Sequence, residues 1–157
     1  MIFHLIVFAF AVGVDAGLRS LTAPAVVAWA AHWGWLNLHN SWLEFIASAP
    51  IRYFLTAVAI IELIADKLPS TPNRTQLTGM TTRFITGGIS ASALFIAAGQ
   101  PFYIGFALGA AGGLAGGFAG YEIRRRLVKS LRISDFPVAL IEDGIAIGAA
   151  LLLVSRV

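Results

Sequence analysis

The chain has 157 residues, of which 58% are hydrophobic and only 12% are charged, and its formal net charge is +3. Soluble domains carry about 25% charged residues, so this chain has too few polar groups to cover a surface that faces water. The apolar residues come in runs of roughly 20, the length that a helix needs to cross a bilayer. The runs are too continuous for a transmembrane barrel. The composition therefore predicts an all-α polytopic transmembrane bundle, with residues 1–157 as a single domain.

Two further properties of the composition narrow the function classes. There are no cysteines, which excludes disulfides, thiolate metal sites and cysteine nucleophiles. The sequence pI is about 9.8. The basic residues flank the apolar runs, so membrane topology explains them better than nucleic-acid binding, and no nucleic-acid partner is expected.

The first membrane segment runs from Ile2 to about Ala31 and is unusually long. A helix of that length would measure about 45 Å, which exceeds the bilayer core, so the segment must tilt, protrude or break. Gly13, Gly17 and Pro24 are the residues at which it could break. A break would add a partial crossing. The run starts without a charged leader, and we expect a retained helix rather than a signal peptide.

Four further segments bring the predicted count to about five. They extend from Ile51 to about Lys67, from about Arg83 to Ala98, from Pro101 to about Tyr121, and from about Pro137 to Ser155. A proline lies at or just before the start of the first, third and fourth of these, where its missing N–H costs a helix nothing.

The basic residues between segments lie mostly on one side of the predicted membrane. That side holds Lys67, Arg74, Arg83, Arg124, Arg125, Arg126, Lys129 and Arg132, whereas the other holds only Arg52 and Arg156. The positive-inside rule makes the basic side cytoplasmic. With five crossings, the N-terminus is predicted to be cytoplasmic and the C-terminus to lie on the opposite side.

The loop on the non-cytoplasmic side is rich in tryptophan. Residues 31–50 contain Trp33, Trp35 and Trp42, which are typical of an interfacial aromatic belt. A short helix on the membrane surface would suit this stretch. The alternative is that the aromatic residues bind a ligand.

Asp15 and Arg19 stand one helical turn apart within the first segment. A charge at the bilayer centre costs about 2.5–3.5 kcal/mol on insertion scales, so each needs an explanation. Their spacing allows them to pair on one helix face. They form either a neutral pair that locks the bundle, with the aspartate also able to cap a restarted helix, or a substrate or ion site at a broken helix.

Glu62 lies about 6 Å deeper in the second segment than Asp66 and Lys67, which we place at the interface. It is a candidate ligand for an ion or a proton. The alternative is that it pairs with a cytoplasmic arginine.

Asp143 is the corresponding candidate in the last segment, because Gly144 and Gly148 would leave room for a ligand beside it. Adjacent helical residues point in different directions, so at most one of Glu142 and Asp143 is expected to face the site. Together with Asp15, these carboxylates predict a transport or ion site.

Glycines form two columns in the fourth segment, one at residues 112, 116 and 120 and the other at Gly105, Gly109, Gly113 and Gly117. Small residues at this spacing let two helices in lipid approach closely. The partner is either a neighbouring helix of the same chain or a second subunit, and a homo-oligomer is expected.

The loop after the second segment offers a different chemistry. Ser70, Thr71 and Arg74 carry the hydroxyl and guanidinium groups that suit an anion or a lipid headgroup. The alternative is an ordinary polar turn.

Residues 17–28 resemble residues 87–98 at an offset of 70, and duplicated halves are common in transporters. Chance similarity between short runs of small residues is the alternative.

Enzyme signatures are missing from the sequence: it contains no H-E-x-x-H, P-loop or G-x-S-x-G motif. A metal site at His32 and His39 would need further ligands that the loop does not clearly offer. We therefore expect no enzymatic activity and no cofactor, and the sequence leaves a metal undecided.

Three motifs together resemble a family of small bacterial integral membrane proteins that carry a domain of unknown function. They are GLRSLTAPAVVAW, ELIADKLPSTPNRT and EDGIAIGAALLL. The resemblance implies a membrane protein of this size and no assigned activity.

The leading functional hypothesis is a transporter or channel for an ion or small polar solute, with Asp15, Arg19, Glu62 and Asp143 at its site. The alternatives are a protein that binds or translocates membrane lipid, and a structural or assembly protein without a transported ligand.

Overall fold

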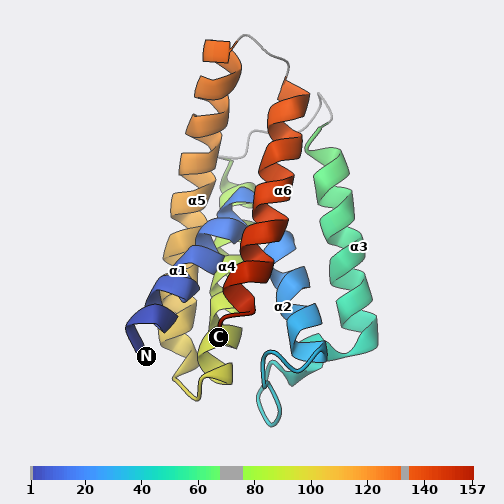
Figure 1. Cartoon of the computed structure of the whole chain (residues 1–157), viewed down its shortest axis with the longest axis vertical. Helices are drawn as coiled ribbons and strands as arrows, with labels where there is room; N and C mark the ends of the chain where they lie inside the picture. The colour runs from blue at the N-terminus through green and yellow to red at the C-terminus, as the bar shows by residue number, and fades with distance from the viewer. Residues whose placement is uncertain (1, 68–75, 132–134) are drawn as a thin grey trace.

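The computed structural model describes residues 2–67, 76–131 and 135–157, which form an elongated bundle of helices (Figure 1). The described residues contain six α-helices and one 3-10 turn, and no strand, which confirms the all-α prediction. The elements are α1 (Ile2–Leu18), α2 (Thr22–His32), η1 (Glu44–Ala47), α3 (Ala49–Ala65), α4 (Leu77–Ala97), α5 (Phe102–Leu131) and α6 (Asp135–Val154).

The long first segment is broken into α1 and α2 by a turn at residues 19–21. The break does not fall at any of the predicted residues. Gly13 and Gly17 lie inside α1, and Pro24 lies in the first turn of α2, where a proline removes no helical hydrogen bond. α2 then runs back toward the end of the bundle from which α1 started (Figure 1).

Because α1 and α2 form a hairpin, both termini lie at the same end of the bundle (Figure 1). Residues from both ends of the chain, including Ile2, His4 and Arg156, line the same pocket. The sequence predicted termini at opposite ends because it counted the first segment as one crossing. Throughout, the end that holds the termini is called the terminal end, and the other is called the basic end.

Helices α1, α4 and α5 pack with their backbones in direct contact. A Cβ on Gly109 of α5 would overlap the carbonyl oxygen of Gly87 in α4, and a Cβ on Gly13 of α1 would overlap the carbonyl oxygen of Gly109. Close contact of this kind requires glycine. The column at residues 105, 109, 113 and 117 faces mainly α4, and the column at 112, 116 and 120 faces α1. Both glycine columns are therefore used within the chain.

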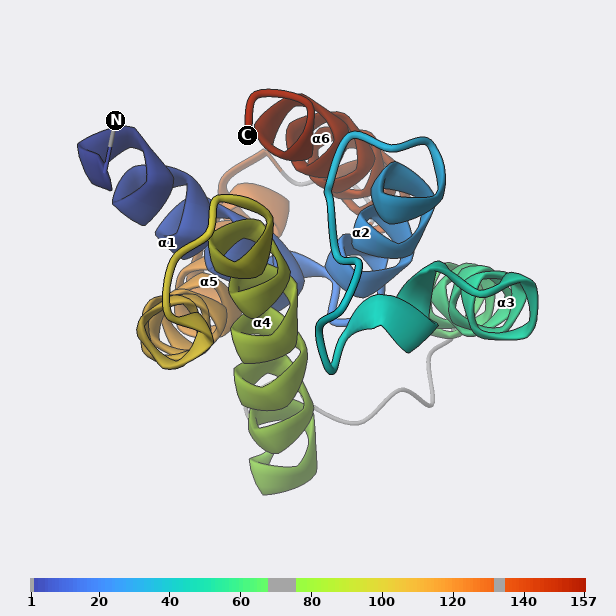
Figure 2. The same cartoon turned by 90° about the horizontal axis from the view of Figure 1, so that it is seen from below.

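The remaining helices lie around this glycine-packed trio. α6 packs against α1 and α2, and α3 packs against α2 and η1 at the edge of the bundle (Figure 2). The two stretches that are similar at an offset of 70 do not have the same structure. Residues 17–28 include the turn between α1 and α2, whereas residues 87–97 lie within the continuous helix α4.

Large apolar side chains lie mainly on the outside of the bundle. Phe3 on α1 is 72% exposed, Ile61 on α3 is 62% exposed and Ile141 on α6 is 63% exposed, whereas alanine dominates the buried apolar residues. Two described helices are both long and apolar enough to cross a membrane, over Phe102–Ser130 and Phe136–Val154. α1 is apolar but shorter.

Candidate functional site

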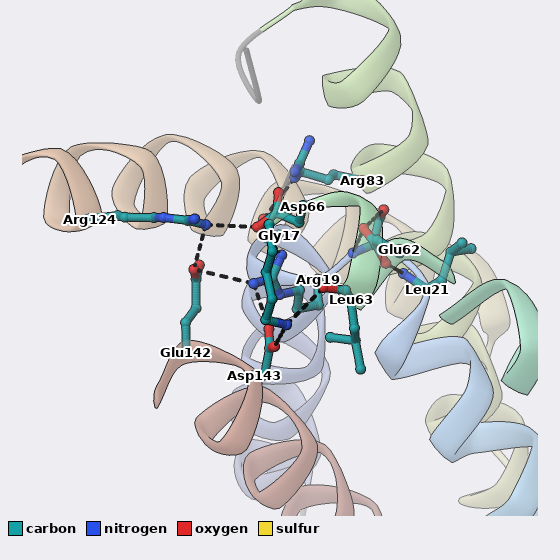
Figure 3. A network of polar contacts seen from close by, with 12 residues as sticks. Gly17, Arg19, Leu21, Glu62, Leu63, Asp66, Arg83, Arg124, Glu142 and Asp143 are labelled. Carbon is teal, nitrogen blue, oxygen red and sulfur yellow. Dashed lines mark hydrogen bonds and ion pairs between the residues drawn. The ribbon is translucent and has the colours of Figure 1, made fainter. Parts of the chain in front are cut away.

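The turn between α1 and α2 inserts Arg19 into a group of charged side chains from three other helices (Figure 3). We call this group the ion cluster. It comprises Arg19 from the turn, Asp66 and Lys67 from the C-terminal end of α3, Arg124 from α5, and Glu142 and Asp143 from α6. Three positive and three negative side chains are thereby brought together, with no formal net charge.

Arg19 lies at the centre of the ion cluster and is only 1% exposed. Its Nη1 contacts Asp66, while its Nη2 lies 2.5 Å from Asp143 and 3.7 Å from Glu142. It is the largest fully buried side chain among the described residues. Burial of a guanidinium is costly unless anionic groups compensate the lost hydration, and the carboxylates of the ion cluster do so here.

Arg124 and Lys67 complete the neutralisation of the carboxylates. Arg124 Nη1 donates to Asp66 at 2.7 Å and to Glu142 at 3.3 Å. Lys67 Nζ donates to Asp143 at 2.5 Å, and also to the carbonyl oxygen of Leu63 at 2.8 Å. The sequence placed Asp66 and Lys67 at the membrane interface and treated Arg124 as a topology signal. The structure shows all three largely buried among the helices at the basic end of the bundle.

The predicted pairing of Asp15 with Arg19 is wrong. Arg19 follows the last residue of α1 and belongs to the turn, so the one-turn spacing no longer places the two side chains on one helical face. Arg19 binds carboxylates from α3 and α6 instead.

The expectation that only one of Glu142 and Asp143 faces the site is also wrong. Both carboxylates approach the same nitrogen of Arg19, Nη2, with Asp143 at 2.5 Å and Glu142 farther away at 3.7 Å. Gly144 and Gly148 do not make room for a ligand beside Asp143. Both are exposed, and a Cβ at either would meet no atom within 4 Å.

Glu62 has a role that neither prediction anticipated, because it binds the start of α2. Its Oε1 accepts hydrogen bonds from the Ser20 N–H at 2.9 Å and from the Ser20 hydroxyl, and its Oε2 accepts one from the Leu21 N–H at 2.8 Å. Free N–H groups and the positive end of a helix both favour a carboxylate there. Glu62 of α3 therefore replaces the missing side-chain cap of α2.

Arg83 caps the C-terminal end of α1 in a similar way. Its Nε donates to the carbonyl oxygen of Gly17 at 2.8 Å, and the side chain is only 6% exposed. The last carbonyls of a helix lack partners within it, and a basic side chain is a favourable donor there. The broken helix is thus stabilised on both sides of its turn, by Arg83 and by Glu62.

Asp15 differs from the other acidic residues of the bundle interior. Its side chain is 3% exposed, and neither carboxylate oxygen has a hydrogen-bond partner. It lines a pocket of about 670 Å³ between α1, α5 and α6, in which every other lining residue is apolar. An unpaired carboxylate in such surroundings is costly, and charged groups retained despite that cost mark functional positions in membrane proteins.

The tryptophan-rich loop lies at the terminal end, and its predicted surface helix is a single 3-10 turn, η1. Trp33, Trp35 and Trp42 are about half exposed. Glu44 accepts hydrogen bonds from His39 and from the Asn40 N–H, which hold the pKa of its carboxyl below the usual range.

Metal ligation finds no support among the described residues, in which no three histidine or acidic side chains are close enough to share an ion. His39 is engaged by Glu44 at 3.0 Å. The predicted anion group of Ser70, Thr71 and Arg74 lies outside the described residues.

Comparison with known families gives a match that covers almost the whole chain. The family model described as "Domain of unknown function (DUF4126)" matches residues 6–155. No curated protein and no solved structure matches the chain significantly.

Proposed function

Because the chain belongs to this family of unknown function, we propose its role from the geometry: a membrane-embedded bundle that moves a proton or small cation past Asp15. The observation that carries the proposal is the contrast among acidic residues. Glu62, Asp66, Glu142 and Asp143 all have polar partners, whereas Asp15 is buried with none.

In this proposal all six helices lie in the bacterial inner membrane. Large apolar side chains on the outer faces of α1, α3 and α6 suit contact with lipid, while alanine, glycine and serine suit tight packing inside. The basic end faces the cytoplasm under the positive-inside rule. Both termini then lie on the opposite side, because they share the other end of the bundle (Figure 1).

The surroundings of Asp15 favour a proton over a metal cation. Hard cations take six or more oxygen ligands, and the pocket offers no second polar side chain. A proton needs a single carboxylate. The oxygens of Asp15 are shielded from the surface, so access requires α6 or α1 to move.

The ion cluster closes the bundle at the basic end. Arg19 is four residues from Asp15 and is bound to both α3 and α6. Release of Arg19 from Asp143 would open the route between α1 and α6 toward the cytoplasm. In this role Arg19 and Asp143 control access, and Glu62 holds the turn that carries Arg19.

The first test is ion flux in proteoliposomes that contain a trapped fluorescent dye, sensitive to H⁺, Na⁺ or K⁺ according to the gradient that is imposed. Gradients of H⁺, Na⁺ and K⁺ are imposed in turn on wild-type protein, on Asp15→Asn and on Glu122→Gln. The control residue is part-exposed and pairs with Arg126 on α5. We expect wild type and Glu122→Gln to dissipate the proton gradient, and Asp15→Asn to be as tight as empty liposomes.

Two results would contradict the proposal. Wild-type liposomes that are as tight as empty ones for all three cations would remove the transport role. They would favour a structural or assembly protein, a reading that the mutually satisfied charges of the ion cluster also suit. Undiminished flux in Asp15→Asn would remove Asp15 from the pathway.

Two earlier expectations remain predictions. A headgroup contact at Ser70, Thr71 and Arg74 still predicts that Arg74→Ala weakens binding of anionic lipid. A homo-oligomer is still expected, but its subunit interface must use surfaces other than the glycine columns, because those columns face α1 and α4 of the same chain.

A further inference from the structure

We propose that Arg52, at the terminal end of the bundle, is the centre of a phosphate-binding site suited to a phospholipid headgroup. This site lies at the opposite end from the ion cluster and does not depend on the proposed transport role. The inference begins from the burial and charge balance of one side chain.

Arg52 is buried, with 6% of its surface exposed, although it lies in the first turn of α3. Its guanidinium stacks on two rings, 4.6 Å from the centroid of Trp29 and 5.1 Å from that of Tyr53. Its Nη1 donates to the carbonyl oxygen of Ala47 at 3.2 Å, and its Nε has no hydrogen-bond partner.

No carboxylate within the described residues forms an ion pair with Arg52. Glu44, the acidic residue nearest in sequence, is engaged by His39 at 3.0 Å and by the Asn40 N–H at 3.1 Å. Aromatic stacking offsets part of the cost of burying a cation but does not neutralise its charge. An anion from outside the chain would do so.

The start of α3 adds a second positive feature at the same place. Ser48, the N-cap residue, makes no side-chain hydrogen bond to the helix, and Pro50 occupies the first turn. The contact with Ala47 holds the guanidinium beside this helix start. An uncapped helix N-terminus and an uncompensated guanidinium both favour an anion, and an arginine fork matches a phosphate.

The neighbouring aromatic residues indicate where that phosphate comes from. Trp33 stacks on Trp29 at 5.5 Å and is 51% exposed, and Tyr53 is 59% exposed. Exposed tryptophan and tyrosine side chains lie at the headgroup level of membranes. A phosphate at that depth belongs to a phospholipid, whose acyl chains would lie along the apolar outer face of α3, beside Phe54 and Ile61.

The test is lipid retention by the full chain, measured by native mass spectrometry. The protein is purified in dodecyl maltoside, stripped of lipid and titrated with dioleoyl-phosphatidylglycerol. Arg52→Gln removes the charge, and Arg52→Lys keeps it without the fork. Arg156→Gln is the matched control, because Arg156 is the other predicted basic residue of that side and lies beside Ile2 and His4.

We expect one tightly retained lipid on wild type and on Arg156→Gln. Arg52→Gln should lower its affinity by about tenfold or more, the effect of one charged hydrogen-bond pair. The lipid affinity of Arg52→Lys should lie between those of wild type and Arg52→Gln. Circular dichroism should show that Arg52→Lys has the helix content of wild type. Displacement of the lipid by 10 mM inorganic phosphate would support the same anion site with a free phosphate as its source.

The proposal is overturned if Arg52→Lys and Arg52→Gln retain lipid as wild type does, or if Arg156→Gln loses it equally. It is also overturned if wild type binds neither the phospholipid nor inorganic phosphate. Should Arg52→Gln fail to fold, the comparison of wild type with Arg52→Lys and the phosphate titration decide the question.

Discussion

At the scale of single residues, the paired buried charges of the bundle have partners that lie far away in the sequence. Asp15, Arg19, Glu62 and Asp143 were all found as charges inside apolar segments. The partners of the last three depend on tertiary contacts of the α1–α2 turn with α3 and α6, which helical spacing within one segment does not contain. Arg124 was missed because an arginine beside a run of basic residues resembles a topology signal.

The most sensitive residue of the ion cluster should be Arg19. Replacing it with methionine leaves Asp66 and Asp143 buried with one fewer cation, and breaking such a pair costs about 3–5 kcal/mol. We expect Arg19→Met to lower the stability of the detergent-solubilised protein by that order, measured by denaturant titration. The control is Arg125→Met, whose side chain is 63% exposed and which should change stability by less than about 0.5 kcal/mol. Equal effects in the two variants would show that the ion cluster contributes little.

At the scale of secondary-structure elements, the sequence predicted the existence of the helices better than their ends. The four later segments correspond to α3, α4, α5 and α6, but α5 continues to Leu131, ten residues beyond the predicted end at Tyr121. The apolar run from which the segment was predicted ends at the first charged residues, whereas the helix continues as long as its backbone hydrogen bonds are formed. The break at residues 19–21 could not be located, because Glu62 and Arg83, which stabilise it, are distant in sequence.

Two glycine-to-alanine substitutions separate close helix packing from intrinsic helix preference. The methyl group of Gly109→Ala would overlap the backbone of α4 and force α5 away, at a cost of about 1–3 kcal/mol or more. Gly144→Ala adds a methyl group on an open face of α6 and should be neutral or stabilising by up to about 1 kcal/mol. Thermal unfolding followed by circular dichroism compares the two. A destabilised Gly144→Ala would mean that a partner covers this face.

At the scale of the whole molecule, one turn decides the topology. Counting the first segment as a single crossing puts the termini on opposite sides, whereas the hairpin of α1 and α2 puts them at one end (Figure 1). Composition and charge bias were sufficient to predict an all-helical chain. They could not decide an odd or even number of passes, since a helix that is long enough to tilt is also long enough to fold back.

The chain has no cysteine, so single cysteines can report its orientation. We expect a membrane-impermeant maleimide added outside the cytoplasmic membrane to label Ile2→Cys, Ser41→Cys and Ser155→Cys. Ser130→Cys, at the basic end of α5, should be labelled only after permeabilisation. The protein without cysteine is the background control. If Ile2→Cys is protected while Ser155→Cys is labelled, the termini lie on opposite sides of the membrane. That result would support the prediction that the first segment crosses the membrane once.

The glycine contacts among α1, α4 and α5 also have a mechanical consequence. Where backbones touch, there are no side-chain rotamers to rearrange, so we expect these three helices to move as one stiff body. α6 is held differently, by the ion cluster and by side-chain packing against α1 and α2. The Asp15 pocket lies on the seam between α1 of the stiff body and α6. Rocking of α6 across that seam is therefore the softest large motion that would expose the carboxylate, and it would strain the Arg19 contacts first.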